Sequence, residues 1–159
     1  MVIPDTGGGY AQSLMESMDS NEIPYTPYKG AAGSNYTSKC GIFTFDNIRG
    51  ETYWRFREAL DPNQPGGSRI ALPPDRRIVA DLTAPKFEVR RGQSGSMVIK
   101  ITSKEDVIKN LGRSPDDGDA IVMAYFDGAK EETHAPLWLS QTNRPSVNMG
   151  HDAKRRKRR

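Results

Sequence analysis

The chain has 159 residues, of which 35% are hydrophobic and 27% are charged, and it contains 15 Gly and 11 Pro. This is the length of one ordinary domain, and the composition excludes a fibrous or wholly disordered protein. No apolar run approaches the ~20 residues that a membrane helix requires. Pro4 and Asp5 interrupt the short apolar start, which excludes a secretory signal. We therefore expect a globular domain without a membrane-spanning segment.

Positive charge is concentrated at the C-terminal end. Residues 154–159, KRRKRR, contribute +6 to a net charge of +3, so residues 1–153 carry a net charge of −3. Such a run binds polyanions or serves as a nuclear-import-like patch, and it is equally typical of a solvated terminus with no selected role. If it contacts nucleic acid, the candidate residues are Lys154, Arg155 and Arg156. We predict one domain at residues 1–130 and a flexible basic tail at residues 131–159.

Cysteine and histidine are scarce. Cys40 is the single cysteine, which excludes an internal disulfide framework and fits a reducing, intracellular compartment. His134 and His151 both lie in the predicted tail. A metal site within the domain must therefore use oxygen ligands, which favours magnesium or manganese over zinc.

The first half of the domain interleaves short strands with helices. The pattern predicts the end of a buried strand at residues 2–3, a glycine-rich turn at 4–9, a helix at 10–18, an edge strand at 23–28 and a loop at 30–39. Charged residues separate apolar and aromatic ones along residues 46–60 in the manner of an amphipathic helix.

The second half continues this alternation. We predict a short strand at residues 69–72, a helix that opens at Pro74 and runs through Leu82, and a hairpin whose strands are residues 87–91 and 97–101. A further helix begins at Ser103 and ends at Gly112, and a largely buried one covers residues 120–126. Strands interleaved with helices indicate the α/β class.

An acidic cluster precedes the last helix. Residues 112–123, GRSPDDGDAIVM, place Asp116, Asp117 and Asp119 ahead of an apolar run. One interpretation is structural: Ser114, Pro115 and Asp117 would form a capping box, with acids favouring the helix dipole. However, Asp116 and Asp119 are three residues apart and share a helix face, where two like charges repel unless a cation neutralises them.

Asp5 is the natural partner for that face, because it follows a buried strand, where α/β folds place ligand-binding groups. An Asx-type turn around Thr6 and the glycines is an equally good explanation of this residue. The glycines fit neither a P-loop, since no Lys-Ser or Lys-Thr follows, nor a dinucleotide fingerprint, since Gln12 stands where the third glycine belongs. Acids from separate elements and a basic arm point to Mg²⁺ or Mn²⁺ acting on a phosphodiester, with two metals ~3.5–4 Å apart.

The order of four stretches resembles a known family. They are VIPDTGGGYAQSLMES, ETYWRFREAL, RIALPPDRRIVADLTAPKFEV and SKEDVIKNLGRSPDDGDAIVMAY. Together they span about residues 1–127 and resemble the C-terminal nuclease domain of the large subunit of tailed-phage DNA-packaging terminases. The resemblance implies an RNase H-like α/β fold, with a central mixed sheet flanked by helices, that cuts concatemeric phage DNA with divalent metal.

The resemblance also implies roles for individual residues. Asp5 resembles the second acidic motif of the family and Asp116 the third, with Asp119 on the next turn as an additional catalytic and metal ligand. Lys104 and Arg113 resemble positions whose charge could contact the DNA backbone or brace the acids, although a surface ion pair is the alternative for each. Asp117 is left as the helix cap.

The chain departs from the family pattern at its N-terminal end. A P-loop ATPase and a strand bearing the first acid are missing ahead of Met1, which leads us to expect an incomplete nuclease domain from a split, truncated or decayed gene. We expect the isolated chain to be weakly active or inactive. Its implied partners are double-stranded DNA, an ATPase-bearing terminase segment, the small terminase subunit and the portal, in the host cytoplasm if a phage or prophage encodes it.

Two alternatives to a terminase remain open. One is another RNase H-like nuclease, of the resolvase or integrase type, in which the first acid comes from elsewhere. The other is a non-catalytic DNA-binding module that uses KRRKRR as its contact. Such a module would lose affinity steeply with salt and would stop binding on deletion of residues 154–159.

Overall fold

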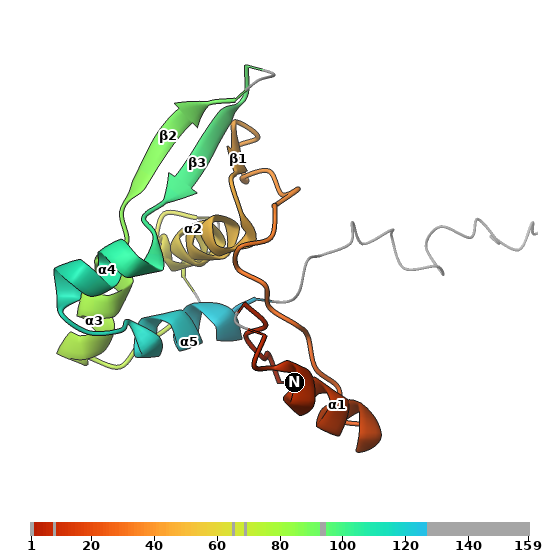
Figure 1. Ribbon diagram of the computed structural model, residues 1–159. Helices are drawn as coiled ribbons and strands as arrows, with labels where there is room; N and C mark the ends of the chain where they lie inside the picture. Colours follow the sequence, from red (N-terminus) through yellow and green to blue (C-terminus); the bar gives the residue numbers. More distant parts are fainter. Residues whose placement is uncertain (1, 8, 65, 69, 93–94, 127–159) are drawn as a thin grey trace, which may run out of the picture. The chain divides into compact units, whose positions relative to one another are not determined.

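The computed structural model describes residues 2–7, 9–64, 66–68, 70–92 and 95–126 (Figure 1). The predicted basic tail, with Lys154, Arg155 and Arg156, lies outside these residues. The elements in chain order are α1 (Gln12–Ser20), β1 (Phe43–Phe45), α2 (Ile48–Leu60), α3 (Arg76–Thr83), β2 (Phe87–Arg91), β3 (Met97–Ile101), α4 (Lys104–Leu111) and α5 (Asp116–Ala124). No helix in the described part of the chain is long and apolar enough to cross a membrane.

The three strands form one mixed sheet in the order β1-β3-β2. β1 runs parallel to β3, whereas β2 pairs antiparallel with β3 from Phe87 opposite Ile101 to Arg91 opposite Met97. The predicted hairpin at residues 87–91 and 97–101 and the predicted mixed sheet are thus confirmed. β1 was not predicted, because a strand of only three residues is too short to show alternation of apolar and polar positions.

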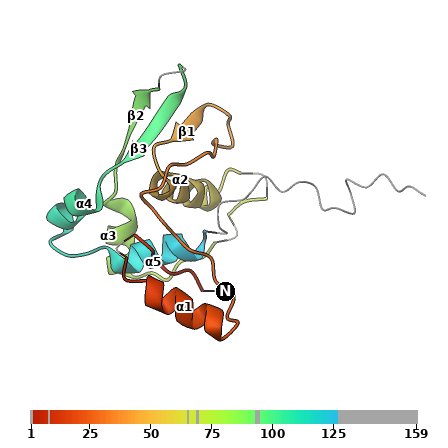
Figure 2. The same cartoon turned by 45° about the vertical axis from the view of Figure 1, so that its right-hand side comes forward.

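Helix α2 separates the sheet from α5. It packs on β1 and β3 through one side and on α5 through another, and α5 in turn packs on α3. Two views show the same arrangement (Figures 1 and 2). Ile99 of β3, Phe56 of α2 and Val122 of α5 are each buried along this stack. Burial of a side chain of this size contributes about 1.5–3 kcal/mol, so the stack fixes where α5 lies.

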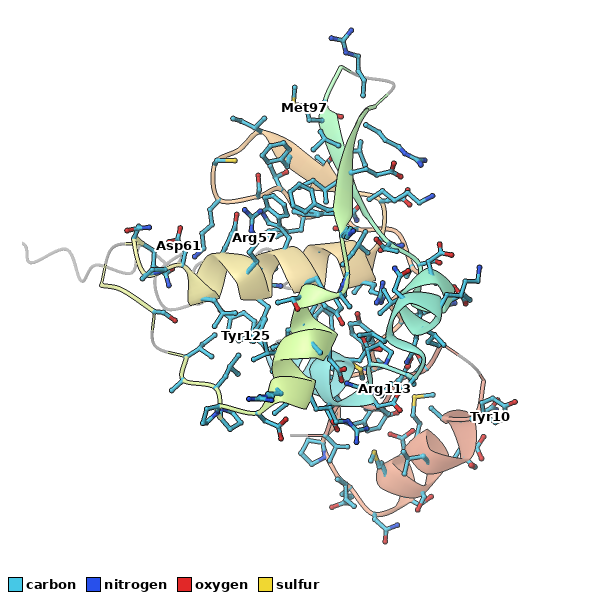
Figure 3. All side chains as sticks on the ribbon, turned by 90° about the vertical axis from the view of Figure 1, so that its left-hand side faces the viewer. Tyr10, Arg57, Asp61, Met97, Arg113 and Tyr125 are labelled. Carbon is cyan, nitrogen blue, oxygen red and sulfur yellow. The ribbon has the colours of Figure 1, made fainter. Side chains whose placement is uncertain are left out.

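Most predicted helices are present with shifted ends. α4 has the predicted cap at Ser103, whose hydroxyl accepts from the Asp106 amide, and it ends at Gly112 with φ of 70°. α1 begins at Gln12 instead of residue 10 and buries Met18. Tyr10, which the prediction placed inside that helix, lies before its first residue and is 92% exposed (Figure 3).

Two predictions of local structure were wrong. Residues 70–72 of the predicted strand at 69–72 lie in irregular backbone, since apolar character alone supplies no pairing partner. Residues 23–28 make only isolated bridges, Val2 to Tyr25 and Asp5 to Tyr28, because the prolines within the segment remove ladder donors. The helix predicted from Pro74 is present with a shifted start, at Arg76, since the Asp75 side chain caps it by accepting from the Arg77 amide.

The predicted capping box at the start of α5 was also wrong. The N-cap position is Pro115, which has no side-chain capping hydrogen bond. The Ser114 hydroxyl donates to Asp116 Oδ1 instead, and Asp117 pairs with Arg77 Nε at 2.7 Å. Both side chains thus have charged partners that are stronger than a backbone amide. Helix α5 therefore begins without a cap from its own sequence.

Candidate active site

Asp5 lies on a short segment that is tied to the chain at Tyr28. The Tyr28 carbonyl accepts hydrogen bonds from the Thr6 amide at 2.8 Å and the Thr6 hydroxyl at 2.9 Å. Asp5 Oδ1 accepts from the Gly7 amide at 2.9 Å, so the Asx-type turn is present. The side chain is nevertheless exposed and lines a pocket. Because a carboxylate has about four lone-pair sites, one turn hydrogen bond leaves it able to bind a cation.

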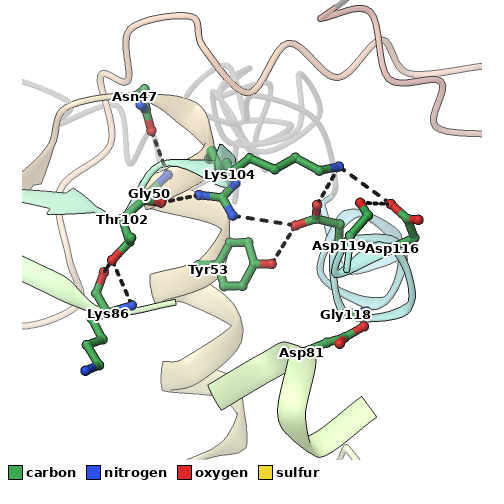
Figure 4. A network of polar contacts seen from close by, with 12 residues as sticks. Asn47, Gly50, Tyr53, Asp81, Lys86, Thr102, Lys104, Asp116, Gly118 and Asp119 are labelled. Atoms are coloured by element: carbon green, nitrogen blue, oxygen red, sulfur yellow. Dashed lines mark hydrogen bonds and ion pairs between the residues drawn. The ribbon is translucent and has the colours of Figure 1, made fainter. Parts of the chain in front are cut away.

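Asp116 and Asp119 project from the same face of α5 toward one lysine. Lys104 Nζ lies 3.0 Å from Asp119 Oδ2 and 3.7 Å from Asp116 Oδ1 (Figure 4). Lys104 is the first residue of α4, directly after its cap. The predicted shared face, and the cation needed to neutralise it, are therefore both present, with the ammonium group as the cation.

Asp119 is held from its other side by α2. Tyr53 donates its hydroxyl hydrogen to Asp119 Oδ1 at 2.6 Å, and Arg49 Nη2 lies 3.8 Å from the same oxygen. Arg49 is itself fixed, because its Nη1 donates to the Thr102 carbonyl at 2.7 Å and its guanidinium lies 5.0 Å over the Tyr53 ring. Both carboxylate oxygens of Asp119 thus have partners, and its orientation is set by two elements.

Sequence reasoning missed Arg49 and Tyr53. The pattern of residues 46–60 indicates an amphipathic helix, in which Tyr53 is one of the apolar or aromatic positions and Arg49 is one of the charged positions that separate them. A signal was present, because the two residues are four apart and so share one helix face. A cation and a hydroxyl on a half-buried face need polar partners, which here come from Asp119 and Thr102.

The electrostatics of the pocket follow from these contacts. Burial alone would lower the pKa of Lys104, but the ion pair with Asp119 and the charges of Asp116 and Asp5 outweigh it and raise that pKa. Burial and the hydrogen bond to Asp119 both raise the pKa of Tyr53. Burial likewise raises the pKa of Tyr28 to about 12. Lys104 therefore stays positively charged, and Tyr53 stays a hydrogen-bond donor, at neutral pH.

The acids line one pocket but do not meet at one point. The pocket has a volume of about 490 Å³, and its lining residues include Asp5, Lys104, Asp116 and Asp119. Within the described part of the chain, no three His, Cys, Asp or Glu side chains lie close enough to hold a metal ion. The donor chemistry fits a hard divalent cation, since every candidate ligand is a carboxylate oxygen. The geometry would require Lys104 to withdraw from between Asp116 and Asp119.

Arg113 lies apart from this pocket. Its Nη2 is 2.5 Å from Asp81 Oδ1 and donates to the Arg77 carbonyl at 3.4 Å, beside α3 (Figure 3). Asp117 likewise points toward α3, through its ion pair with Arg77. The structure thus gathers Asp5, Lys104, Asp116 and Asp119 on one side of α5, and it places Arg113 and Asp117 elsewhere.

Comparison with known proteins finds likeness in structure only. No family model and no curated protein matches the chain. The nuclease domain of the large terminase subunit gp2 of bacterial virus Sf6 aligns with a TM-score of 0.53 at 18% identity, over 78% of this chain and 64% of that one. A lysine-to-alanine mutant of that domain with manganese gives 0.52 at 17%, over 78% and 64%. The same type of mutant from bacteriophage Sf6 with calcium gives 0.52 at 17%, over 78% and 63%.

These alignments show the fold. The chain has the RNase H-like α/β fold of a phage terminase nuclease domain, as its sequence motifs predicted. It spans less than two thirds of the length of these structures, at 64%, 64% and 63%.

Proposed function

We propose that this chain is part of a divalent-metal-dependent DNA nuclease of the phage terminase large-subunit type. The observation that supports it most is that Asp5, Asp116 and Asp119, from two distant segments, line one pocket around Lys104 on this fold. The acids would bind Mg²⁺ or Mn²⁺, in keeping with the related structures with manganese and calcium. Cleavage of concatemeric viral DNA in the host cytoplasm would be its task.

The residues around the pocket have separable parts in this proposal. A bound divalent ion would supply Lewis-acid polarisation of the phosphate and a more acidic water. Asp119 is already oriented by Tyr53 and Arg49, so it would bind with little loss of side-chain entropy. When a divalent ion binds, Lys104 would move away from Asp116 and Asp119. Its ammonium group would then be free to contact a phosphate oxygen of the DNA.

The rest of the machinery is proposed from the fold alone. Full-length function would need an ATPase-bearing terminase segment, the small terminase subunit and the portal. Residues 131–159 would form a flexible basic tail in which Lys154, Arg155 and Arg156 contact DNA non-specifically. We expect the chain by itself to cut weakly, because in its described residues no three acidic side chains lie close enough together to hold a metal ion.

The test combines binding with cleavage. We would titrate the full chain with Mn²⁺ by calorimetry and follow nicking of supercoiled plasmid, for the wild type, Asp119→Asn and Asp117→Asn. Both variants remove one charge from the same turn, but only Asp119 lines the pocket. We expect Asp119→Asn to weaken manganese binding and any nicking by about 100-fold, which corresponds to about 2.7 kcal/mol of lost stabilisation at 1.36 kcal/mol for each factor of ten. Asp117→Asn should resemble the wild type.

Two results would contradict the proposal. One is a wild-type chain that stays folded and binds no Mn²⁺ at millimolar concentration. The other is binding that Asp119→Asn and Asp117→Asn reduce equally, which would make it a general effect of negative charge.

A further inference from the structure

Asp81 is a buried carboxylate that has no part in the pocket. It lies in α3, is 0% exposed, and is thus shielded from water on all sides. Its Oδ1 forms an ion pair with Arg113, and its Oδ2 accepts a hydrogen bond from the Gly118 amide at 3.3 Å. Burial of a charge is costly unless the charge is paired and hydrogen-bonded, and here both oxygens have partners.

The Gly118 amide is one that a helix cap normally satisfies. α5 begins at Asp116, so Gly118 is its third residue, and the first intrahelical hydrogen bond is that of the Asp119 amide to the Pro115 carbonyl at 2.9 Å. An N-cap side chain usually accepts from the second or third amide of the helix. Pro115 offers no such acceptor, so Asp81 provides it from another helix.

The packing leaves no freedom at this contact. A Cβ atom on Gly118 would lie 2.6 Å from Asp81 Cβ and 3.2 Å from the Asp81 backbone carbonyl carbon. The two helices therefore touch backbone to backbone at the turn that carries Asp116 and Asp119. Only glycine permits this approach, because a Cβ atom here would clash with rigid atoms of α3 that cannot rotate aside as the end of a flexible side chain could.

Arg113 ties the segment before α5 to the same carboxylate. Besides its ion pair with Asp81, it donates to the Arg77 carbonyl and, through Nη1, to the Ser114 carbonyl at 3.0 Å. Burial alone would raise the pKa of Asp81, but Arg113 and the Gly118 amide outweigh it and hold that pKa below its ordinary value. Asp81 therefore remains charged at neutral pH.

We propose that Asp81 is a positioning residue for the pocket. It caps α5 across the helix interface and, with Arg113, fixes the rotation of α5 that directs Asp116 and Asp119 toward Lys104. The capping follows from the contacts, whereas its purpose at the pocket rests on the proposed function. A ligand set needs placement within about 0.5 Å, and an uncapped first turn that frays would not give it.

The experiment measures the first turn of α5 directly. We would compare the full-length wild type with Asp81→Asn, Arg113→Lys and Arg77→Met, following amide hydrogen exchange by NMR and Mn²⁺ affinity by calorimetry. Asp81→Asn keeps the shape and an acceptor oxygen but loses the charge, while Arg113→Lys keeps the charge. Arg77→Met is the matched control, because it breaks the exposed ion pair with Asp117 across the same two helices.

We expect Asp81→Asn to speed exchange of the Gly118 amide about tenfold relative to Val107 in α4, because charge-assisted hydrogen bonds are roughly twice as strong as neutral ones. Manganese affinity should fall about tenfold, the scale seen when partners of ligands are changed. In both Gly118 exchange and manganese affinity, Arg113→Lys should give values between those of Asp81→Asn and the wild type. Arg77→Met should match the wild type in both measurements.

Two outcomes would overturn this inference. If Asp81→Asn leaves Gly118 exchange unchanged, Asp81 does not cap α5. If exchange rises equally at Gly118 and Val107, Asp81 is a general stabiliser and not a positioning residue. A wild type that binds no manganese would refute the proposed function separately, and the exchange at Gly118 would then decide the inference alone.

Discussion

The two sides of α5 treat charge in opposite ways. On the side that faces α3, the Asp81 carboxylate is fully buried, engaged at both oxygens and pressed against Gly118. On the side that faces the pocket, Asp116 is 68% exposed and shares the Lys104 ammonium with Asp119. One short helix thus carries a fixed charge contact on one side and an exchangeable one on the other.

This difference shows how the acids of a pocket can be held in a fixed position and still have a cation partner that can be exchanged. Removing one partner of a buried pair leaves an uncompensated charge, whereas exposed pairs contribute little and reform easily. Lys104 is 41% exposed, although Asp119 is only 16% exposed, and under the proposed function a divalent cation would take the place of the lysine. Under the same proposal, the buried contact with α3 would hold the acids in place while their partner changes. Three predictions test this contrast.

The largest expected effect is on the α3 side. Gly118→Ala would place Cβ 2.6 Å from Asp81 Cβ, so the two helices must move apart. Overpacking typically costs about 1–3 kcal/mol, and a Cβ this close to another helix puts the cost near the upper end, against which alanine regains ~1 kcal/mol over glycine in a helix. We expect the free energy of unfolding, measured by urea denaturation, to fall by about 2 kcal/mol.

Gly50 supplies the matched control. It is also a buried glycine within a helix, but a Cβ there would lie 3.4 Å from Asn47 Oδ1, its nearest neighbour, and 3.8 Å from the Ile99 carbonyl. Gly50→Ala should therefore be neutral or stabilise the fold by up to about 1 kcal/mol. Equal effects of the two substitutions would mean that the α3 side of α5 yields as readily as other packing.

The next effect depends on pH. The pKa of Asp81 is lowered in the fold, so on acidification the unfolded chain binds this proton before the folded one does. The stabilisation is complete above the ordinary aspartate value of about 3.9 and is lost as pH falls through the folded-state pKa. We therefore expect the difference in unfolding free energy between wild type and Asp81→Asn to narrow below about pH 4.

Measuring that difference isolates one carboxylate. Asp106 also has a lowered pKa, because Ser103 and Lys109 hydrogen-bond to it, and it contributes to the acid sensitivity of both proteins. It lies in α4 and shares no partner with Asp81, so its contribution cancels in the comparison. A difference that stays constant from neutral pH down to about pH 2.5 would contradict a lowered pKa for Asp81.

Sequence patterns predicted the pocket side better than the α3 side. The spacing of Asp116 and Asp119 is a local property of one helix, so it indicated a shared face and the need for a cation. The hairpin and α4 could be predicted for the same reason, since the turn and cap residues that specify them are close in sequence to the elements themselves. The RNase H-like fold was implied by the resemblance of four motifs to the terminase family, and the structural alignments show it.

The contacts that sequence could not supply join distant segments. Asp81 is 37 residues from Gly118, and along α3 it looks like an ordinary polar position of an amphipathic helix. Tyr53 is 66 residues from Asp119, and the pattern of residues 46–60 indicates only that it is one of the apolar or aromatic positions of an amphipathic helix. The capping box failed for the same reason, because Arg77 of α3 competes for Asp117. In each case the partner is set by how α2, α3 and α5 pack.

The smallest expected effect is on the pocket side. Tyr53→Phe removes the hydroxyl that Asp119 Oδ1 accepts from, but Arg49 and Lys104 still face that carboxylate. We expect the free energy of unfolding to fall by about 1 kcal/mol, below the ~1.5–3 kcal/mol typical of hydrogen bonds to charged groups, because these cations compensate. Tyr25→Phe is the matched control, since Tyr25 donates to Asp19 at 3.2 Å on the exposed surface and its loss should be undetectable. A loss for Tyr53→Phe as large as that for Gly118→Ala would mean that the pocket side of α5 is as fixed as the α3 side. Lys104 could not then leave the acids cheaply, and the exchange of cations on which the contrast depends would fail.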